Sequence, residues 1–248
     1  MKKINEAFIL KQYETGVNSY TDFTKEVGLW ASEEAVFTEY IDTKDEILDL
    51  GCGTGRTTFP LFQLGYQNII GVDLTPEMIT SAKALNQYFN TNIDFRIGNA
   101  KSLEFDNNIF DVVIFSFNGL MSIPQLENRE AALKEINRVL KPNGVFIFTT
   151  HDREAEAGFL KFWKEEAKKW ESGKQNKALY EFGDIIAMSK NESREIFIHI
   201  PIQKEVINLL NDNGFEVVET FYRSERFAES EQVKIKSGEC RFWIARKI

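Results

Sequence analysis

The sequence predicts a doubly wound α/β fold, in which helices cover both faces of a mostly parallel, seven-stranded sheet. From residue 46 onwards, short apolar runs alternate with segments of helical periodicity, which is typical of βαβ units. A glycine-rich turn follows the first apolar run, at the edge of the sheet where such folds bind ligands. The chain has 248 residues, which is enough for one such domain with an insertion.

Seven short, mostly apolar runs are expected to be the strands. They cover residues 47–50, 68–72, 93–97, 111–115, 145–149, 215–220 and 240–245. The run at 111–115 is almost continuously apolar, as expected of a strand buried on both faces. Helical periodicity is expected up to Leu64, from Pro76 with Thr75 as N-cap, over 129–140 and over 204–210. This order of elements predicts a core formed by residues 46–152 and 201–248.

Two segments lie outside this alternation. Residues 1–45 read as helical and are expected to form an N-terminal cap. Residues 153–200 are expected to form an inserted lid over the ligand edge of the sheet. The lid begins with an amphipathic helix whose stripe includes Phe159, Trp163 and Trp170, followed by β-like runs at 185–188 and 195–200 with a turn at 190–192. The stripe can touch a membrane, but the mixed Lys and Glu polar face favours packing against the domain.

Charge and cysteine content narrow the class of protein. The formal net charge is −8, and no block of Lys or Arg stands out, so nucleic acid is not an expected partner. Cys52 and Cys240 form no metal or redox CxxC spacing, which indicates reduced thiols and no metal site. No apolar stretch is long enough to cross a bilayer. We therefore expect a soluble, cytoplasmic protein without a membrane or nucleic-acid partner.

The most informative segment is the glycine loop after the first strand, Asp49-Leu50-Gly51-Cys52-Gly53-Thr54-Gly55-Arg56. Glycines there let the backbone approach a ligand closely. A dinucleotide-binding loop has the pattern GxGxxG, and its third glycine would fall at Arg56. The loop is GxGxG instead, with an acid two residues before it. This departure argues against a nicotinamide-dependent oxidoreductase.

Five segments in this order resemble the class I S-adenosylmethionine-dependent methyltransferases. They are the glycine loop with Asp73 at the end of the second strand, Gly98-Asn99-Ala100, the segment 110–114, the helix and turn at 133–144, and the segment 213–219. The resemblance covers roughly residues 45–150 and 203–248. Asn99 departs from the aspartate that is common in the family, which keeps an acceptor but loses the charge. The segment 115–120 also differs from the Asn-Pro-Pro-Tyr motif of amino-methylating nucleic-acid enzymes.

The resemblance implies S-adenosylmethionine as cofactor and S-adenosylhomocysteine as product. Asp73 would bind both ribose hydroxyls, and Asn99 would contact the adenine amine. Asp49 would orient the amino-acid end, by itself or through water. The implied cofactor-binding residues are Asp49, Gly51, Cys52, Gly53, Gly55, Asp73, Leu74, Met78, Asn99, Ala100 and Ser116. Simpler roles stay open: Asp73 as a helix cap, Asp49 as an acceptor for loop amides, Met78 and Cys52 as packing residues. Arg56 is expected to be a surface charge.

Catalytic and substrate-binding residues are harder to assign. His151 follows the fifth strand at the ligand edge, so it is a candidate general base, or a loop histidine bonded to backbone. Asn118 follows the fourth strand and is a candidate substrate contact. His199 is expected to be structural. The candidate lid residues are Tyr13, Tyr20, Trp30 and Tyr180, although aromatic residues in helices are usually core.

Three functions are compatible with these patterns. The first is a methyltransferase, monomeric or homodimeric, acting on a small molecule at an amine, a hydroxyl or an activated carbon. The second is a catalytically inactive S-adenosylmethionine-binding regulator or subunit, for which a lid over the pocket would have little use. The third is the oxidoreductase that Arg56 argues against. Methyl transfer needs mainly positioning and a dry site, because the cofactor carries the reactive group.

Overall fold

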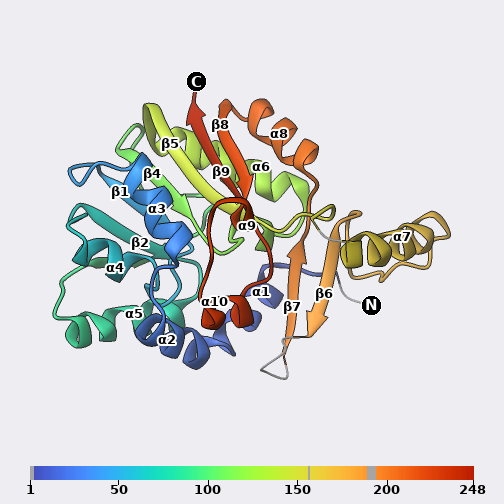
Figure 1. The fold of residues 1–248 in the computed structure, drawn as a ribbon, viewed down its shortest axis with the longest axis horizontal. Helices are drawn as coiled ribbons and strands as arrows, with labels where there is room; N and C mark the ends of the chain where they lie inside the picture. The colour runs from blue at the N-terminus through green and yellow to red at the C-terminus, as the bar shows by residue number, and fades with distance from the viewer. Residues whose placement is uncertain (1–2, 156, 189–193) are drawn as a thin grey trace.

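Seven strands form the central sheet of this computed structural model, which describes residues 3–155, 157–188 and 194–248 (Figure 1). Their order across the sheet is β3-β2-β1-β4-β5-β9-β8. β9 runs antiparallel to β5 and β8, whereas β1 to β5 pair in parallel. The strands are β1 (Ile47–Leu50), β2 (Ile69–Asp73), β3 (Asp94–Ile97), β4 (Phe110–Phe115), β5 (Leu140–Thr150), β8 (Phe215–Tyr222) and β9 (Arg241–Lys247). The predicted doubly wound, mostly parallel sheet is confirmed.

Helices cover both faces of the sheet, because successive strand side chains point to opposite sides. In β1, Ile47 packs on one face, and Leu48 and Leu50 pack on the other. The first face is covered by α3 (Ala31–Tyr40), α4 (Thr58–Gln63) and α5 (Pro76–Phe89). The second face is covered by α6 (Leu126–Val139) and α8 (Gln203–Asp212). These two apolar layers hold the carboxyl ends of β1 to β4 at one edge.

The N-terminal segment lies across this edge. It contains α1 (Glu6–Glu14) and α2 (Val17–Glu26), which both pack against α5, and α3, which belongs to the core layer. Two short helices, α9 (Arg223–Arg226) and α10 (Glu231–Lys236), lie between β8 and β9. Val233 of α10 and Phe23 of α2 share one apolar cluster, so the C-terminal connection supports the N-terminal segment.

The insertion packs against the N-terminal segment. It consists of α7 (Ala157–Glu171) and a hairpin of β6 (Asp184–Met188) and β7 (Glu195–His199). Phe197 of β7 shares an apolar cluster with Ile4 and Ile9, and the Ile4 amide donates to the carbonyl of Ala178. The predicted turn at 190–192 lies outside the described residues. The insertion therefore supports α1 from the side.

Only part of the aromatic stripe of α7 faces the protein: Trp163 is buried, whereas Phe159 and Phe162 are exposed. Trp163 and Trp170 both pack edge-on against Phe182, although α7 itself lies at the far edge of the molecule (Figure 1). In the part of the chain that the structure describes, no helix is both long and apolar enough to cross a membrane.

Arg56 is buried, which corrects the expectation of a surface charge. Only 7% of the residue is exposed, and its guanidinium donates two hydrogen bonds of 2.6 Å to the carboxylate of Glu33. Burial alone would lower the pKa of Arg56, but the Glu33 carboxylate raises it above its usual value. The guanidinium also lies over the ring of Trp30. This ion pair joins the start of α3 to the glycine loop, inside an aromatic cluster.

Removing one partner of this pair should strongly destabilise the fold. Glu33→Gln leaves the Arg56 charge buried without a full partner, which typically costs about 3–5 kcal/mol of unfolding free energy. Urea unfolding followed by circular dichroism would measure it. Glu34→Gln, at the exposed neighbouring position, is the matched control and should stay within about 0.5 kcal/mol of the wild type. Equal stability of the two variants would contradict this role.

Candidate functional site

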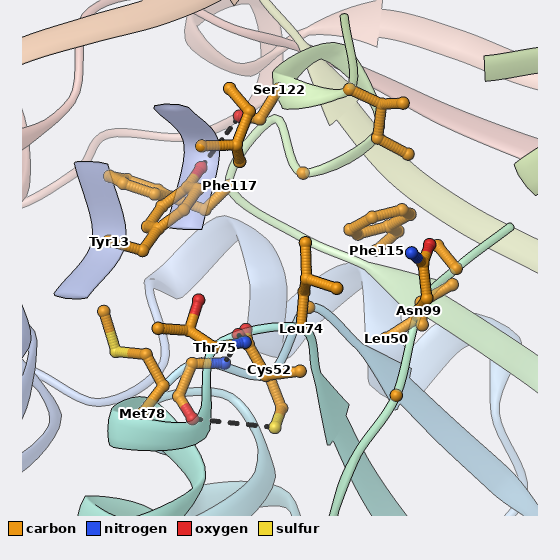
Figure 2. Close-up of a pocket in the computed structure, with 18 of the residues that line it drawn as sticks. Tyr13, Leu50, Cys52, Leu74, Thr75, Met78, Asn99, Phe115, Phe117 and Ser122 are labelled. Atoms are coloured by element: carbon orange, nitrogen blue, oxygen red, sulfur yellow. Dashed lines mark hydrogen bonds between the residues drawn. The ribbon is translucent and has the colours of Figure 1, made fainter. Parts of the chain in front are cut away.

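A cavity opens at the carboxyl edge of the sheet, where β1, β2, β3 and β4 end (Figure 2). It has about 230 Å³ of space that the centres of water molecules can reach, enough for a ligand much larger than water. Residues of α1, of the glycine loop and of the segment after β4 line it. Most of the predicted cofactor-binding residues contribute to the lining: Gly51, Cys52, Gly53, Asp73, Leu74, Met78, Asn99, Ala100 and Ser116.

Glycines in the loop are required by the backbone. Gly51 has a φ of 68° and Gly53 a φ of 55°, in the left-handed region that side chains disfavour. A Cβ at Gly51 would also lie 2.5 Å from the ring of Phe115. Gly55 (φ 90°) packs against Phe59 and does not line the cavity, so it shapes the loop from behind. The loop backbone therefore forms one wall of the cavity.

Asp73 connects this loop to the start of α5. Its carboxylate accepts the amide of Gly53 at 2.9 Å and the amide of Thr75 at 2.8 Å. Burial raises the pKa of Asp73, and the two amides oppose this shift. Thr75 is the N-cap but makes no side-chain capping bond. Each carboxylate oxygen keeps a lone pair, so Asp73 can accept hydrogen bonds from both hydroxyls of a diol while it holds the loop.

Asp49 lies behind the loop, away from the cavity. Asp49 was expected to orient the amino-acid end of the cofactor by itself or through water, and its side chain does not line the cavity. The side chain is almost fully buried and accepts a 2.6 Å hydrogen bond from the hydroxyl of Thr58, at the start of α4. Burial raises the pKa of Asp49 to about 7, although the Thr58 hydroxyl opposes the shift. Its visible role is to fix the first turn of α4 against β1.

The loop after β3 forms the next part of the wall. The side-chain carbonyl of Asn99 accepts the amide of Lys101 at 3.0 Å, and its amide group donates to Glu6 at 2.9 Å. Lys101 also pairs with Glu6 at 3.0 Å. The end of β3 is therefore bonded to the first turn of α1, a contact that sequence reasoning missed.

The opposite side of the cavity is aromatic. Tyr13 and Tyr20 line it, as predicted for lid residues, together with Phe117. The Tyr13 hydroxyl donates to Ser122 at 2.8 Å, on the far side of the cavity from Cys52 (Figure 2). Burial raises the pKa of Tyr13, so its hydroxyl stays protonated. Ser122 belongs to the short 3-10 helix η1 (Leu120–Ser122), so the Tyr13 contact joins α1 to the segment after β4.

Trp30 and Tyr180 do not line the cavity, which corrects their prediction as lid residues over it. Trp30 is fully buried beside Arg56, and the Tyr180 hydroxyl donates to the carbonyl of Ile4. None of the described residues of 153–200 lines the cavity. The covering element is α1, and the insertion lies beside it.

His151 and Asn118 also lie outside the cavity lining, in contrast to their predicted roles in contact with substrate. His151 Nδ1 lies 2.8 Å from the Glu239 carbonyl and Nε2 lies 3.3 Å from the Asn118 side-chain amide. This arrangement requires a neutral ring that donates from Nδ1 and accepts at Nε2. Burial lowers the pKa of His151, which favours the neutral form. The two residues hold the loop after β4 from behind.

That loop has an uncommon backbone. Phe117 and Asn118 have φ values of 54° and 63°, so two successive non-glycine residues are left-handed. Such strain costs on the order of 1–3 kcal/mol per residue and concentrates at functional sites. The backbone amide of Asn118 donates to the hydroxyl of Thr149, which helps to hold this conformation. The left-handed backbone turns the Phe117 ring towards Trp30, with 5.5 Å between the ring centroids, and Phe117 forms part of the cavity wall.

His199 is paired inside the insertion, in agreement with the structural role expected for it. Its Nδ1 lies 2.9 Å from the Asp184 carboxylate, and the other Asp184 oxygen accepts the amides of Tyr180 and Glu181. Glu181 in turn pairs with Arg129 at 2.8 Å. These acidic groups are therefore bonded within the protein and fix the base of the β6–β7 hairpin.

A family model described as a methyltransferase domain matches residues 41–214. An uncharacterized protein of Methanocaldococcus jannaschii is 31% identical over 214 residues, which cover 86% of this chain and 78% of that protein. A demethylmenaquinone methyltransferase of Staphylococcus saprophyticus is 30% identical over 183 residues, covering 72% and 73%. The match to the Lactococcus lactis enzyme of the same name is 44% identical but covers only 42% of each chain.

Solved structures share the fold. An S-adenosylmethionine-dependent methyltransferase of Methanosarcina mazei superposes with a TM-score of 0.69 at 23% identity, over 90% of this chain and 99% of the other. The PH0226 protein of Pyrococcus horikoshii gives a TM-score of 0.63 at 21% identity, over 87% of both chains. At these identities the superpositions support the fold alone.

The raised pKa of Asp49 predicts a pH-dependent stability. The folded protein keeps this proton up to about pH 7, whereas the unfolded chain releases it near pH 3.9. Stability should therefore fall as the pH rises from about 4 to about 7, by at most about 4 kcal/mol for this group. Asp49→Asn should remove this component of the pH dependence, as measured by urea unfolding at pH 5, 6, 7 and 8. The exposed control Asp106→Asn should follow the wild type; a profile unchanged in Asp49→Asn would refute the assignment.

Proposed function

This chain belongs to the methyltransferase domain family and is an S-adenosylmethionine-dependent methyltransferase, and we propose that its cofactor lies across the carboxyl ends of β1, β2 and β3. The observation that carries this proposal is Asp73. Its carboxylate lines the cavity at the end of β2, next to the loop of β1, with acceptor capacity left on both oxygens. A ribose diol has the two donors that such a carboxylate binds.

The glycine loop fits the same ligand. Gly51 and Gly53 bring bare backbone to the cavity, so an amino-acid end of the cofactor can lie against the loop without a side chain in its place. Met78 and Leu74 add apolar wall beside Asp73, where a flat base can pack. With the ribose at Asp73, the sheet order β3-β2-β1 supports an arrangement in which base, ribose and amino-acid end follow one another along the edge.

The acceptor side of the cavity favours a small, uncharged molecule. Phe117, Tyr13 and Tyr20 give this side an aromatic wall. The charge of Arg56 is paired with Glu33 and is not available to a substrate. A flat, uncharged ring fits these surroundings best. A relative bears the name demethylmenaquinone methyltransferase, which makes the ring of demethylmenaquinone, without its long tail, the first acceptor to test.

The cavity residues contribute position and exclusion of water. The bound cofactor supplies a methyl group on a positively charged sulfur, which is open to in-line displacement. The aromatic wall keeps water away from the displacement, and α1 covers the site. The Tyr13 hydroxyl donates a hydrogen bond to Ser122. Its oxygen can therefore accept a hydrogen bond from a hydroxyl or amine of the substrate. Because burial keeps the Tyr13 hydroxyl protonated, Tyr13 is suited to orient the methyl acceptor rather than to deprotonate it.

Calorimetric titration with S-adenosylhomocysteine tests the cofactor site. The wild type should bind it, and Asp73→Ala should weaken binding about 100-fold or more, because two charge-assisted hydrogen bonds are lost. The control Asp94→Ala, on the exposed end of β3, should bind as the wild type does. NADH should not bind to any of them.

Two results would count against the proposal. A folded wild-type protein that binds neither S-adenosylmethionine nor S-adenosylhomocysteine would contradict the cofactor site. Equal affinity in the wild type and in Asp73→Ala would show that the ligand lies elsewhere. The unfolding midpoint of Asp73→Ala must be measured alongside, because Asp73 also holds the amides of Gly53 and Thr75.

A further inference from the structure

We propose that Glu6, on α1, accepts the hydrogen bond of the adenine amino group and thereby selects adenine over other bases. This inference rests on the cofactor site proposed above. It concerns a residue outside the sheet, in the helix that covers the cavity. The helix that closes the site would thus read the cofactor directly.

The sheet order locates the base. With the ribose at Asp73 on β2 and the amino-acid end at the loop of β1, the base lies towards β3, beside Gly98 and Asn99. Glu6 lines the cavity at this place, since its carboxylate contacts both Asn99 and Lys101. A side chain from the N-terminal segment is therefore present where the edge of the base would lie.

The side chain of Asn99 turns its amide group towards Glu6. Its carbonyl oxygen accepts the amide of Lys101 at 3.0 Å, and its amide group donates to Glu6 Oε2 at 2.9 Å. Each end of the side chain thus already makes one hydrogen bond within the protein. The amide of Asn99 holds the carboxylate of Glu6 at the cavity. The charge that an aspartate at position 99 would carry is supplied by Glu6.

One oxygen of Glu6 remains for a ligand. Asn99 and Lys101 both bond Oε2, and Oε1 bonds no other group in the described parts of the chain. The hydrogen bond from Lys101 lowers the pKa of Glu6, so the carboxylate is ionised and can only accept. The amino group of adenine is a donor, whereas hypoxanthine presents an acceptor oxygen at that position. A carboxylate therefore favours the first and repels the second.

The same helix reaches the acceptor side. Glu6, Ile9 and Tyr13 are spaced i, i+3 and i+7, so they share one face of α1, and all three line the cavity. Glu6 contacts the end of β3, and Tyr13 bonds Ser122 after β4. A base bound to Glu6 would fix the helix that carries Tyr13. Cofactor binding would then complete the acceptor side before the substrate enters.

The test compares S-adenosylhomocysteine with S-inosylhomocysteine, its deaminated analogue, by calorimetry. In Glu6→Gln, one oxygen can still bond Asn99 and Lys101, while an NH₂ donor replaces the acceptor that adenine needs. We expect S-adenosylhomocysteine to bind about tenfold more weakly, and the preference for adenine over hypoxanthine to fall by at least about tenfold. Glu14→Gln, on the same helix, should keep the wild-type affinities and preference, because Glu14 pairs with Lys11 at the surface.

The preference between the two ligands separates recognition from support of the helix. If Glu6→Gln weakens both ligands equally, Glu6 only holds α1 in place and the inference is wrong. Wild-type affinities in Glu6→Gln would also overturn it. Absence of S-adenosylhomocysteine binding by the wild type would instead refute the proposed function, and this inference with it. The unfolding midpoint of Glu6→Gln, expected within a few degrees of the wild type, shows that the protein is folded.

Discussion

The site depends on one carboxylate held by two backbone amides. Asp73 bonds Gly53 in the loop of β1 and Thr75 at the start of α5, so the ends of two neighbouring strands keep a fixed spacing. A mostly parallel sheet brings such ends to one edge, and the left-handed glycines let the backbone come close to a ligand there. The carboxylate that organises the loop is thus also the group best suited to a ribose. In the proposed function, one residue therefore serves both the loop structure and cofactor binding.

The N-terminal segment turns this open edge into a cavity. The buried Arg56–Glu33 pair joins the start of α3 to the glycine loop, and Glu6 and Tyr13 attach α1 to the segments after β3 and β4. The insertion supports α1 from the side through the cluster around Ile4 and Phe197. The N-terminal segment is therefore held on the open edge by polar contacts to the sheet ends and by the apolar cluster with the insertion.

The sequence predicted the sheet and many residues of the cavity wall, because both depend on local patterns such as apolar runs and the Gly51–Gly55 loop. It did not predict which distant side chains meet. Arg56 looked like a surface charge since its partner, Glu33, lies 23 residues earlier in the chain. His151 was expected at the ligand edge, but its ring is held by Glu239 and Asn118, which come from distant segments. The i, i+3, i+7 spacing of Glu6, Ile9 and Tyr13 could have indicated one face of the covering helix. No pattern in the sequence indicates the left-handed backbone at Phe117.

A crystal structure of the complex with S-adenosylhomocysteine tests the central claim most directly. The account predicts both ribose hydroxyls within hydrogen-bonding distance of the Asp73 carboxylate, with the homocysteine end along the glycine loop and the base beside Gly98 and Asn99. A ligand bound elsewhere, or bound with its base towards β4 and its ribose away from Asp73, would contradict it.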